Sequence, residues 1–454
     1  MITVENEKRR MEKMDASRQA VKDCLYEHRI FGYEPGNVSY FLGEYPLRFS
    51  MEPTEYDYRV LKKYADYGIT LIKLHEEWND SIRCLGADKY TAHDDSGFRK
   101  FVDLCHHLGL KVLPYVSTGF IHTYDPDFRP EFTRTDRLCS GQYFRYAICS
   151  LKSPEWRSFI YEKAMNIMDE YGVDGLYNDH PADYLIDYVY GYRDKYGVSP
   201  DPDDAPYDPY TEEFLVRFYQ GIKARGGTSI LHLMENYHLI TKERHYDYFN
   251  VGEGVSTGKA LLKSKCYMPH IINILDKKSQ TEFGPDFPFA LAIPYMQFPR
   301  LNHGRRLMRD KTEAGVPWFD VDDKSLFHFW KRAAKYAQEH PNGPYTHGEF
   351  SAIPDPPDLV DRYGGFLKLY RPMITDGSLA HVELHKTTLL CREDVPDDII
   401  ATLYTNEKQY LVFTNIGKTP WEAELTDEWT DRVSGKRAKT FTVPPQQIIF
   451  LEKE

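Results

Sequence analysis

Short strand-like apolar runs alternate with amphipathic helices along this chain, and the alternation limits what it can fold into. The clearest runs cover residues 69–74, 111–116 and 174–179. The segments between them repeat apolar residues at a period of 3.6, as helices with one buried face do. A βαβα order with short apolar strands predicts a parallel sheet covered by helices. The length and repetition favour a closed α/β fold, the (β/α)8 TIM barrel, over an open sheet.

Other barrel strands are predicted with less support from their surroundings. We expect strands at residues 229–234 and 246–251, and another near residues 287–293. The first strand is placed around residues 29–33, and the last one is not placed. The segment at residues 200–209 is rich in Pro and Asp, and it predicts a long loop over the strand ends, either a wall of the site or an inert surface loop.

The pattern changes after about residue 375. Residues 399–414 read as two β-strands around a turn, and residues 440–451 form another β-rich run. With 454 residues the chain fits one large domain and a smaller one of about 80 residues. We therefore predict a catalytic barrel with an N-terminal extension at residues 1–375 and a small C-terminal antiparallel β-sandwich domain at residues 376–454.

Composition and net charge limit the kinds of partner that this chain is expected to bind. A net charge of −12 argues against nucleic acid or an anionic membrane, since both attract positive surfaces. The seven cysteines are scattered without a C-x-x-C pair, which indicates reduced thiols. The charged N-terminus lacks the apolar core of a signal peptide, and no run of about 18 apolar residues occurs. We expect a cytoplasmic protein, and the absence of a nucleotide-binding glycine motif predicts no cofactor.

Three predicted strands end on carboxylates. Asp179 ends one strand, Glu235 follows the next, and Glu253 follows a third, between two glycines. Catalytic side chains of a β/α barrel stand at the carboxyl ends of its strands. Hydrolysis of a glycosidic bond needs two carboxyl groups, one to protonate the leaving oxygen and one to attack or to activate water. These residues therefore predict an enzyme that acts on sugars and uses carboxylates as its catalytic groups.

Two of these carboxylates also have a simpler interpretation. Asp179 could cap the helix that follows it, and Glu235 could pair with an arginine or bind a substrate hydroxyl. The residues expected to bind the sugar flank the strand ends, as carboxylates, amides, imidazoles and aromatic rings. They are Glu76, Glu77, Trp78, Tyr115, Tyr177, Asn178, His180, Asn236 and His238.

One block of sequence carries a family resemblance. Residues 153–179 contain SPEWR, a long helical segment and YGVDGLYND. This block resembles the strand 3–helix–strand 4 region of glycoside hydrolase barrels of the α-galactosidase-like and related families, and the likeness is clear over residues 69–179. The resemblance implies a retaining enzyme in which Asp179, at the end of strand 4, is the nucleophile. A C-terminal β-domain is also typical of these families.

The block departs from that family at two points. The lysine expected two residues before the nucleophile is Tyr177. The acid/base aspartate expected on strand 6 would correspond to Glu253. If strand 5 supplies the acid instead, as in α-amylase-like barrels, Glu235 takes that role.

The sequence therefore predicts a glycoside hydrolase with a carboxylate-pair, retaining mechanism, a carbohydrate as its partner and no metal. Two alternatives stay open. In a metal-dependent sugar isomerase or hydrolase, Asp179, His180, Glu235 and His238 would surround a divalent cation. In the other alternative, a catalytically inactive barrel binds carbohydrate. The oligomeric state is left open, with a homo-oligomer among the alternatives.

Overall fold

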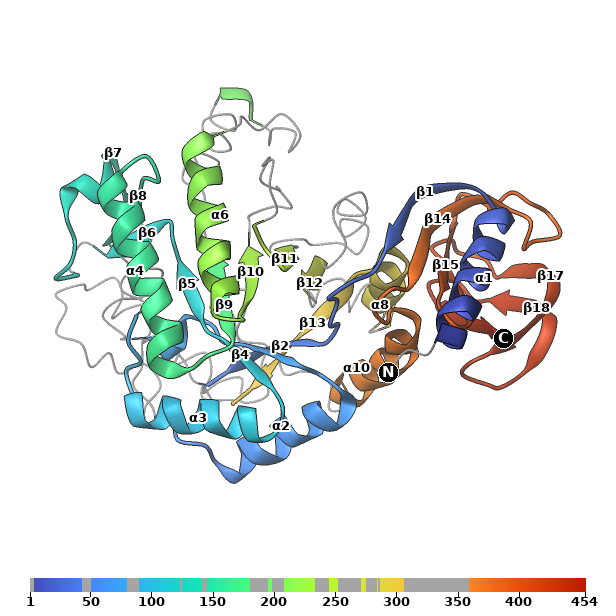
Figure 1. Cartoon of the computed structure of the whole chain (residues 1–454), viewed down its shortest axis with the longest axis horizontal. Coiled ribbons are helices and arrows are strands. Elements are labelled where there is room, and N and C mark those ends of the chain that lie inside the picture. The colour runs from blue at the N-terminus through green and yellow to red at the C-terminus, as the bar shows by residue number, and fades with distance from the viewer. Residues whose placement is uncertain are drawn as a thin grey trace. The chain divides into compact units, whose positions relative to one another are not determined.

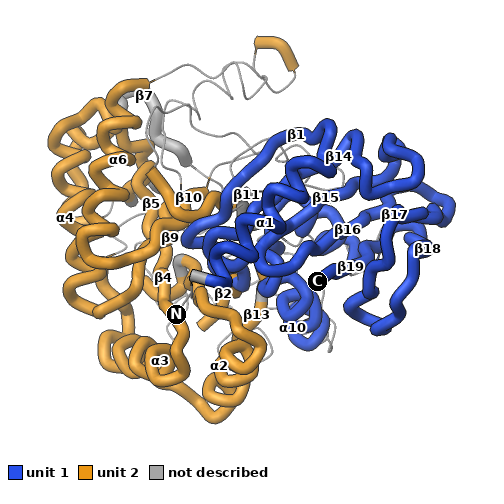
Figure 2. The backbone as a smooth tube through the Cα atoms, turned by 45° about the vertical axis from the view of Figure 1, so that its right-hand side comes forward, with its two compact units in different colours: residues 1–36, 255–299, 359–454 blue, residues 37–254, 300–358 orange. Residues whose placement is uncertain are grey.

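The computed structural model describes residues 4–42, 50–79, 90–122, 125–140, 145–179, 195–197, 208–232, 245–251, 271–274, 284, 286–305 and 359–454. The chain divides into two compact units (Figure 2). One unit comprises residues 37–254 and 300–358, and the other comprises residues 1–36, 255–299 and 359–454. The domain boundary at residue 375 stays a prediction.

Nine strands form one sheet. They are β2 (Asn37–Phe41), β3 (Leu71–Lys73), β4 (Lys111–Leu113), β5 (Tyr115–Ser117), β9 (Gly175–Asp179), β10 (Thr228–His232), β11 (Tyr248–Val251), β12 (Ile271–Ile274) and β13 (Phe298–Gly304). Their order is β4-β3-β2-β13-β12-β11-β10-β9-β5. Every neighbouring pair whose register is known is parallel.

The sheet closes on itself at Pro114. This residue separates β4 from β5, because a proline cannot donate a hydrogen bond to a strand ladder. Its carbonyl oxygen still accepts a hydrogen bond from the Tyr177 amide at 3.0 Å, so the link to β9 continues past the break. β4 and β5 are therefore two halves of one strand. Counted in this way, the described residues supply the eight strands of a closed barrel, which confirms the predicted (β/α)8 fold.

Local capping residues mark the ends of several helices. The unit of residues 37–254 and 300–358, called the barrel unit below, contains α2 (Glu55–Tyr67), α3 (Asp95–His107), α4 (Pro154–Tyr171) and α6 (Pro209–Ala224). The helices α4 and α6 lie side by side in Figures 1 and 2. Ser153 caps α4, accepting a hydrogen bond from the Trp156 amide at 3.2 Å. Gly172 ends the helix in the left-handed conformation. Asp208 caps α6, and residues 200–207 of the predicted loop lie outside the described residues.

Two predicted strands are wrong. Residues 287–292 form the short helix α8 (Phe287–Ala292), followed by a 3-10 turn at Ile293–Tyr295. The first barrel strand is β2, whereas the region before residue 30 forms β1 (Val21–Arg29), which pairs antiparallel with β14 (Leu379–Thr387). β12 and β13, the seventh and eighth barrel strands, were not predicted.

The C-terminal region forms a seven-stranded antiparallel sheet, as expected for a small β-domain. Its order is β1-β14-β15-β16-β19-β17-β18, so the N-terminal strand belongs to it. The remaining strands are β15 (Ile399–Thr405), β16 (Gln409–Asn415), β17 (Trp421–Asp431), β18 (Arg437–Val443) and β19 (Ile448–Lys453). The helices α1 (Val4–Ala20) and α10 (Leu359–Tyr370) belong to the same unit. A cluster of buried apolar side chains on these strands forms its core.

A small antiparallel sheet follows the third barrel strand. It contains β6 (Phe120–His122), β8 (Arg145–Cys149) and β7 (Thr133–Ser140), in that spatial order. Two further 3-10 turns lie in the barrel unit, at Glu76–Trp78 after β3 and at Pro130–Phe132 before β7. A last one follows α10 at Arg371–Met373.

Candidate active site

Asp179 is the last residue of β9, the fourth strand of the barrel. Its side chain is mostly buried, with 13% of its surface exposed. Gly175 begins the same strand at φ 155°, and a Cβ there would lie 1.9 Å from the carbonyl oxygen of Thr228. Glycine therefore permits the close pairing of β9 with β10 that places Asp179 at the carboxyl end of the barrel.

Two neighbouring strands hold the Asp179 carboxylate. The Tyr115 hydroxyl, on β5, donates to Oδ2 at 2.8 Å. On the other side, Nδ1 of His232 at the end of β10 lies 3.0 Å from Oδ1. Each oxygen thus has a partner from a different strand, and hydrogen bonds to a charged oxygen are short and strong. These two contacts hold the carboxylate in one orientation.

Tyr115 and Tyr177 lie beside this carboxylate with their rings buried. Their ring centroids are 5.5 Å apart in a T-shaped contact. The Tyr177 hydroxyl lies 2.8 Å from Nδ1 of His232, the same nitrogen that contacts Asp179. Their hydroxyl groups thus contact the Asp179–His232 pair. The sugar contacts expected of both tyrosines stay predictions.

Asn178 points away from this cluster, as strand alternation requires. Its Oδ1 accepts a hydrogen bond from the Thr118 hydroxyl at 3.0 Å. The Thr118 amide donates to the backbone oxygen of Asp179 at 3.2 Å. Asn178 therefore helps to fasten the segment after β5 to the end of β9.

Trp78 is fully buried and has a packing role in the structure. Its ring stacks on Phe98 with centroids 5.0 Å apart, and its Nε1 donates to the Tyr115 carbonyl at 3.0 Å. A ring without exposed surface offers no face to a sugar, so Trp78 is left out of the site proposed below. Its hydrogen bond supports the backbone that carries Tyr115.

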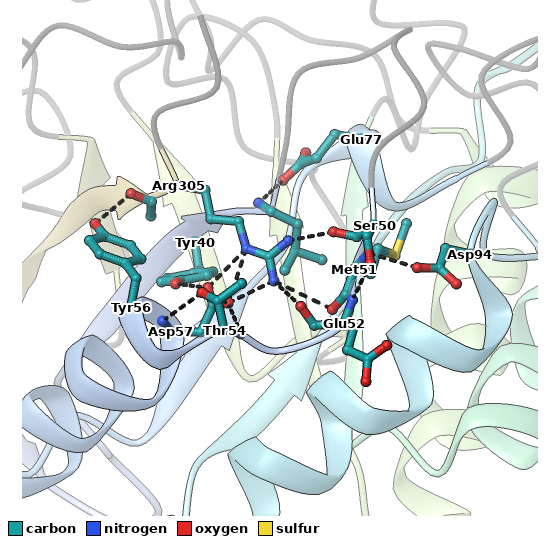
Figure 3. A network of polar contacts seen from close by, with 12 residues as sticks. Tyr40, Ser50, Met51, Glu52, Thr54, Tyr56, Asp57, Glu77, Asp94 and Arg305 are labelled. Atoms are coloured by element: carbon teal, nitrogen blue, oxygen red, sulfur yellow. Dashed lines mark hydrogen bonds and ion pairs between the residues drawn. The ribbon is translucent and has the colours of Figure 1, made fainter. Parts of the chain in front are cut away.

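Glu77 is also buried, and its Oε1 accepts a hydrogen bond from the Leu42 amide at 3.1 Å (Figure 3). The carboxylate thereby joins the ends of the first two barrel strands. The Glu76 backbone lies in the same 3-10 turn, but its side chain lies outside what the structure describes.

The remaining predicted residues lie outside the described residues. They are Glu235, Glu253, His180, Asn236 and His238. Along the chain, Glu235 comes three residues after the end of β10, and Glu253 comes two residues after the end of β11. Their roles, and the separation of either carboxyl group from Asp179, stay predictions.

A second polar cluster surrounds Arg305, immediately after the eighth strand (Figure 3). Its guanidinium donates to both oxygens of the fully buried Asp57 carboxylate, with Nε 3.0 Å from Oδ1 and Nη2 2.7 Å from Oδ2. The same guanidinium donates to the carbonyl oxygens of Ser50, at 2.6 Å, and Glu52, at 2.8 Å. Arg305 therefore ties the segment after β2 and the start of α2 to the end of β13.

The charge state of this cluster follows from its contacts. Burial alone would raise the pKa of Asp57, but hydrogen bonds from Arg305 and Tyr40 outweigh it and lower that pKa. Burial and the adjacent carboxylate raise the pKa of Tyr40 well above its ordinary value, so its hydroxyl stays protonated and donates to Asp57 at 2.5 Å. The cluster is an ion pair that joins the end of β13 to the start of α2.

His232 and Arg305 were missed by sequence reasoning. His232 lies within the strand predicted at residues 229–234, and its period-2 position could have marked it as facing the barrel interior. Arg305 contacts Asp57 across 248 residues of sequence, a distance that no local pattern spans.

Among the residues described, no three His, Cys, Asp or Glu side chains are grouped closely enough to share a metal ion. Three of the four ligands of the metal-dependent alternative lie outside these residues, so that alternative stays open. No helix in the described part of the chain is long and apolar enough to cross a lipid bilayer.

Comparison with known proteins identifies the fold through structure. No protein-family model and no curated protein sequence matches the chain. The α-glucosyl transfer enzyme XgtA is 12% identical, with a TM-score of 0.56 over 93% of this chain and 99% of its own. The chain therefore shares the barrel fold of this enzyme. The C-terminal antiparallel sheet completes the same architecture.

Two α-amylases give the same result. The enzyme of Geobacillus thermoleovorans, complexed with acarbose, is 10% identical with a TM-score of 0.53, covering 92% of this chain and 98% of its own. The noncanonic maltogenic α-amylase AmyB of Thermotoga neapolitana is 12% identical with a TM-score of 0.50, at the same coverage of 92% and 98%. None of these three is an α-galactosidase, so the α-galactosidase-like part of the resemblance gains no support from them. Identities this low establish the fold alone.

Proposed function

We propose that this chain is a retaining glycoside hydrolase with Asp179 as its nucleophile. The observation that carries the proposal is the placement of Asp179 at the carboxyl end of the fourth barrel strand. Its two oxygens are held by Tyr115 and His232, and part of its side chain stays exposed to a reactant. A carboxylate fixed in this way can attack without first reorganising its surroundings.

The reaction follows from the two carboxyl groups. An Asp179 oxygen attacks the anomeric carbon while the second carboxyl group gives its proton to the leaving glycosidic oxygen. Water then attacks the glycosyl-enzyme, and the second group, now a carboxylate, removes the proton from that water. No metal takes part in this scheme.

For the second carboxyl group we favour Glu235 over Glu253. Glu235 follows the fifth barrel strand, the position of the acid in α-amylase-like barrels, and two of the similar structures are α-amylases. The same similarity favours an α-glucosidic bond as the substrate. A retaining enzyme would have its carboxyl groups about 5 to 5.5 Å apart, an inverting one about 6.5 to 9.5 Å. A cytoplasmic location and a homo-oligomer remain predictions from sequence.

Hydrolysis of a panel of aryl α- and β-glycosides tests the proposal. Wild type should cleave an α-glucoside, and Asp179→Ala and Glu235→Ala should not, whereas Glu253→Ala should retain activity. Asp174→Asn is the matched control, because Asp174 lies just before the opposite end of β9 and bonds to His106 and the Val112 amide. Treatment with EDTA should leave the rate unchanged.

Rescue of activity by azide distinguishes the nucleophile from the acid/base residue. In Asp179→Ala a small anion can enter the space of the lost carboxylate and attack the sugar, giving a glycosyl azide of inverted configuration.

Loss of activity in EDTA would favour the metal-dependent alternative. Binding of oligosaccharide without cleavage, unchanged in Asp179→Ala, would favour an inactive carbohydrate-binding barrel.

A further inference from the structure

A lysine is buried inside the barrel, close to the candidate nucleophile. Lys73 is the last residue of β3, and its side chain is fully buried. Its Nζ lies 3.5 Å from the centroid of the Tyr177 ring, well within the range of a cation–π interaction. Removing an ammonium group from water is costly, and an aromatic face offsets only part of that cost. A fold that keeps such a charge at this depth has a use for it.

Contacts within hydrogen-bond distance lead from the Tyr177 ring to Asp179. The Tyr177 hydroxyl lies 2.8 Å from Nδ1 of His232, and that nitrogen lies 3.0 Å from Oδ1 of Asp179. The His232 ring also stacks on the Tyr177 ring, with centroids 5.9 Å apart and planes 26° apart. A change in the position of Tyr177 would therefore move His232, and with it the carboxylate.

The Tyr177 hydroxyl has a further anchor. Nδ2 of Asn250, on β11, lies 3.4 Å from it and donates to it. Oδ1 of Asn250 accepts from Nη1 of Arg300, a fully buried arginine on β13, also at 3.4 Å. Tyr177 is thus held at its face by Lys73 and at its hydroxyl by side chains from two other strands.

We propose that Lys73 is a positioning residue for Asp179: its ammonium group fixes the Tyr177 ring, and through Tyr177 and His232 it keeps the carboxylate ionised and correctly aimed. The inference rests on the proposed function, since it assigns a task to Lys73 in the attack by Asp179. Lys73 does not touch the substrate in this scheme. It acts through the tyrosine that stands where the related families carry a lysine.

The groups around Asp179 determine which of its two protonation states is favoured. A cation near Asp179 stabilises the carboxylate over the carboxylic acid, and so does an Nδ1–H that donates to Oδ1. Several other titratable or charged groups face the Asp179–Tyr177 pair from the elements around it. Among the described residues these are His75 just after β3, Tyr115 on β5, His232 on β10 and Arg300 on β13. Removal of Lys73 deletes a charge and leaves Tyr115 and His232, the partners of Asp179 described above, in place.

The pH dependence of kcat/KM, whose acid limb reports the free enzyme's nucleophile, is the first readout. In Lys73→Met the acid limb should move to higher pH by about one unit. At the optimum kcat/KM should fall about 100-fold, as expected for a misplaced reacting group. Lys73→Arg keeps the charge and should keep the acid limb. Lys62→Met is the matched control, because Lys62 is exposed and forms an ion pair with Asp66, one helical turn away on the surface of α2.

Tyr177→Phe keeps the ring under Lys73 and removes the hydroxyl that meets His232. It should move the acid limb in the same direction as Lys73→Met. This variant decides the question by itself if Lys73→Met does not fold. An unchanged acid limb in either folded variant, with hydrolysis intact, overturns the inference while the hydrolase proposal stands.

A second readout needs no substrate. In protein labelled at histidine, the imidazole signal of His232 can be assigned by its loss in His232→Gln. The signal should move in Lys73→Met and stay in place in Lys62→Met. If wild type cleaves no glycoside, the proposed function fails, and this signal still tests the connection: a shift supports it, and an unmoved signal refutes it.

Discussion

The barrel and the C-terminal sheet bury very different side chains. Polar and charged residues are buried on seven barrel strands, among them Asn37, Ser39, Lys73, Ser117, Asp179, His232, Asn250 and Arg300. The C-terminal sheet buries a cluster built from residues such as Leu403, Leu411, Phe413, Trp429 and Leu451. Its strands also bury polar residues, among them Thr402, Gln409 and Thr414, but these three carry no charge, unlike Lys73, Asp179 and Arg300 of the barrel. Burying charge opposes folding, whereas burying apolar surface drives it. The difference supports the proposal that the barrel carries the catalytic groups, and it predicts that the interior of the C-terminal sheet contributes to stability alone.

The largest effect is expected where the barrel has no room for a side chain. Gly175→Ala would place a Cβ 1.9 Å from the Thr228 carbonyl oxygen, at a φ of 155° that alanine rarely adopts. We expect a loss of about 5 kcal/mol in the free energy of unfolding. Hydrogen exchange should rise in peptides from β9 and β10. Gly172→Ala is the control, since Gly172 also has a positive φ but nothing lies within 4 Å of its added Cβ; an equal loss there would show that strain alone is responsible.

The next effect tests whether buried charge is tolerated only in pairs. Arg305→Met leaves the fully buried Asp57 carboxylate without its guanidinium partner. We expect a loss of about 4 kcal/mol, measured by urea denaturation. Arg225→Met is the matched control, because Arg225 makes the same two-oxygen contact, at 2.8 and 2.7 Å, with the exposed Asp169. The loss of unfolding free energy in Arg225→Met should stay below about 1 kcal/mol. Similar losses in both variants would contradict the idea that a buried charge depends on its partner more than an exposed one does.

A core substitution in the C-terminal sheet should affect stability alone. Leu411 is fully buried on β16, and Leu411→Ala should cost about 3 kcal/mol of stability. Peptides from β15 and β16 should exchange faster, while kcat of the folded enzyme should not change. Val433→Ala, at an exposed position of the same unit, serves as the control. A large drop in kcat for Leu411→Ala would mean that the C-terminal sheet contributes to catalysis as well as to stability.

The smallest effect is a dependence on pH. The pKa of Asp57 is lower in the folded protein than in the unfolded chain, so this residue adds stability above its unfolded pKa near 3.9. That contribution is lost as the pH falls through the lower, folded value. Without Arg305, burial instead raises the pKa of Asp57. The stability difference between wild type and Arg305→Met should therefore begin to narrow above about pH 4, where the buried Asp57 of the variant takes up a proton. It should narrow further below about pH 4, as wild type loses its own contribution, whereas the difference for Leu411→Ala should stay constant.

Local patterns in the sequence predicted five of the barrel strands and the long helix before Asp179. Ser153, Pro154 and Gly172 are start and stop signals, and they act locally as expected. The run at residues 287–293 was misassigned because a short apolar stretch suits a buried helix as well as a strand. Pro288, at the start of α8, was the missed signal. β13 escaped notice because Pro299, Arg300 and His303 interrupt its apolar pattern.

The candidate site was predictable only in part. Asp179 follows from its place at a strand end, because that rule depends on the chain's own order. The partners of its carboxylate come from Tyr115, 64 residues away, and from His232 on the next strand. Such contacts depend on strand register and barrel closure, which a single sequence does not state. For the same reason Lys73 gave no local sign that it would lie on the Tyr177 ring.

Covalent trapping tests the role of Asp179 most directly. A fluorinated glycoside that forms a glycosyl-enzyme faster than it hydrolyses should add the mass of one sugar to the protein. Peptide mapping should place that mass on Asp179, and Asp179→Asn should gain none. An adduct on another residue, or rapid cleavage with inverted configuration and no adduct, would contradict a nucleophilic Asp179.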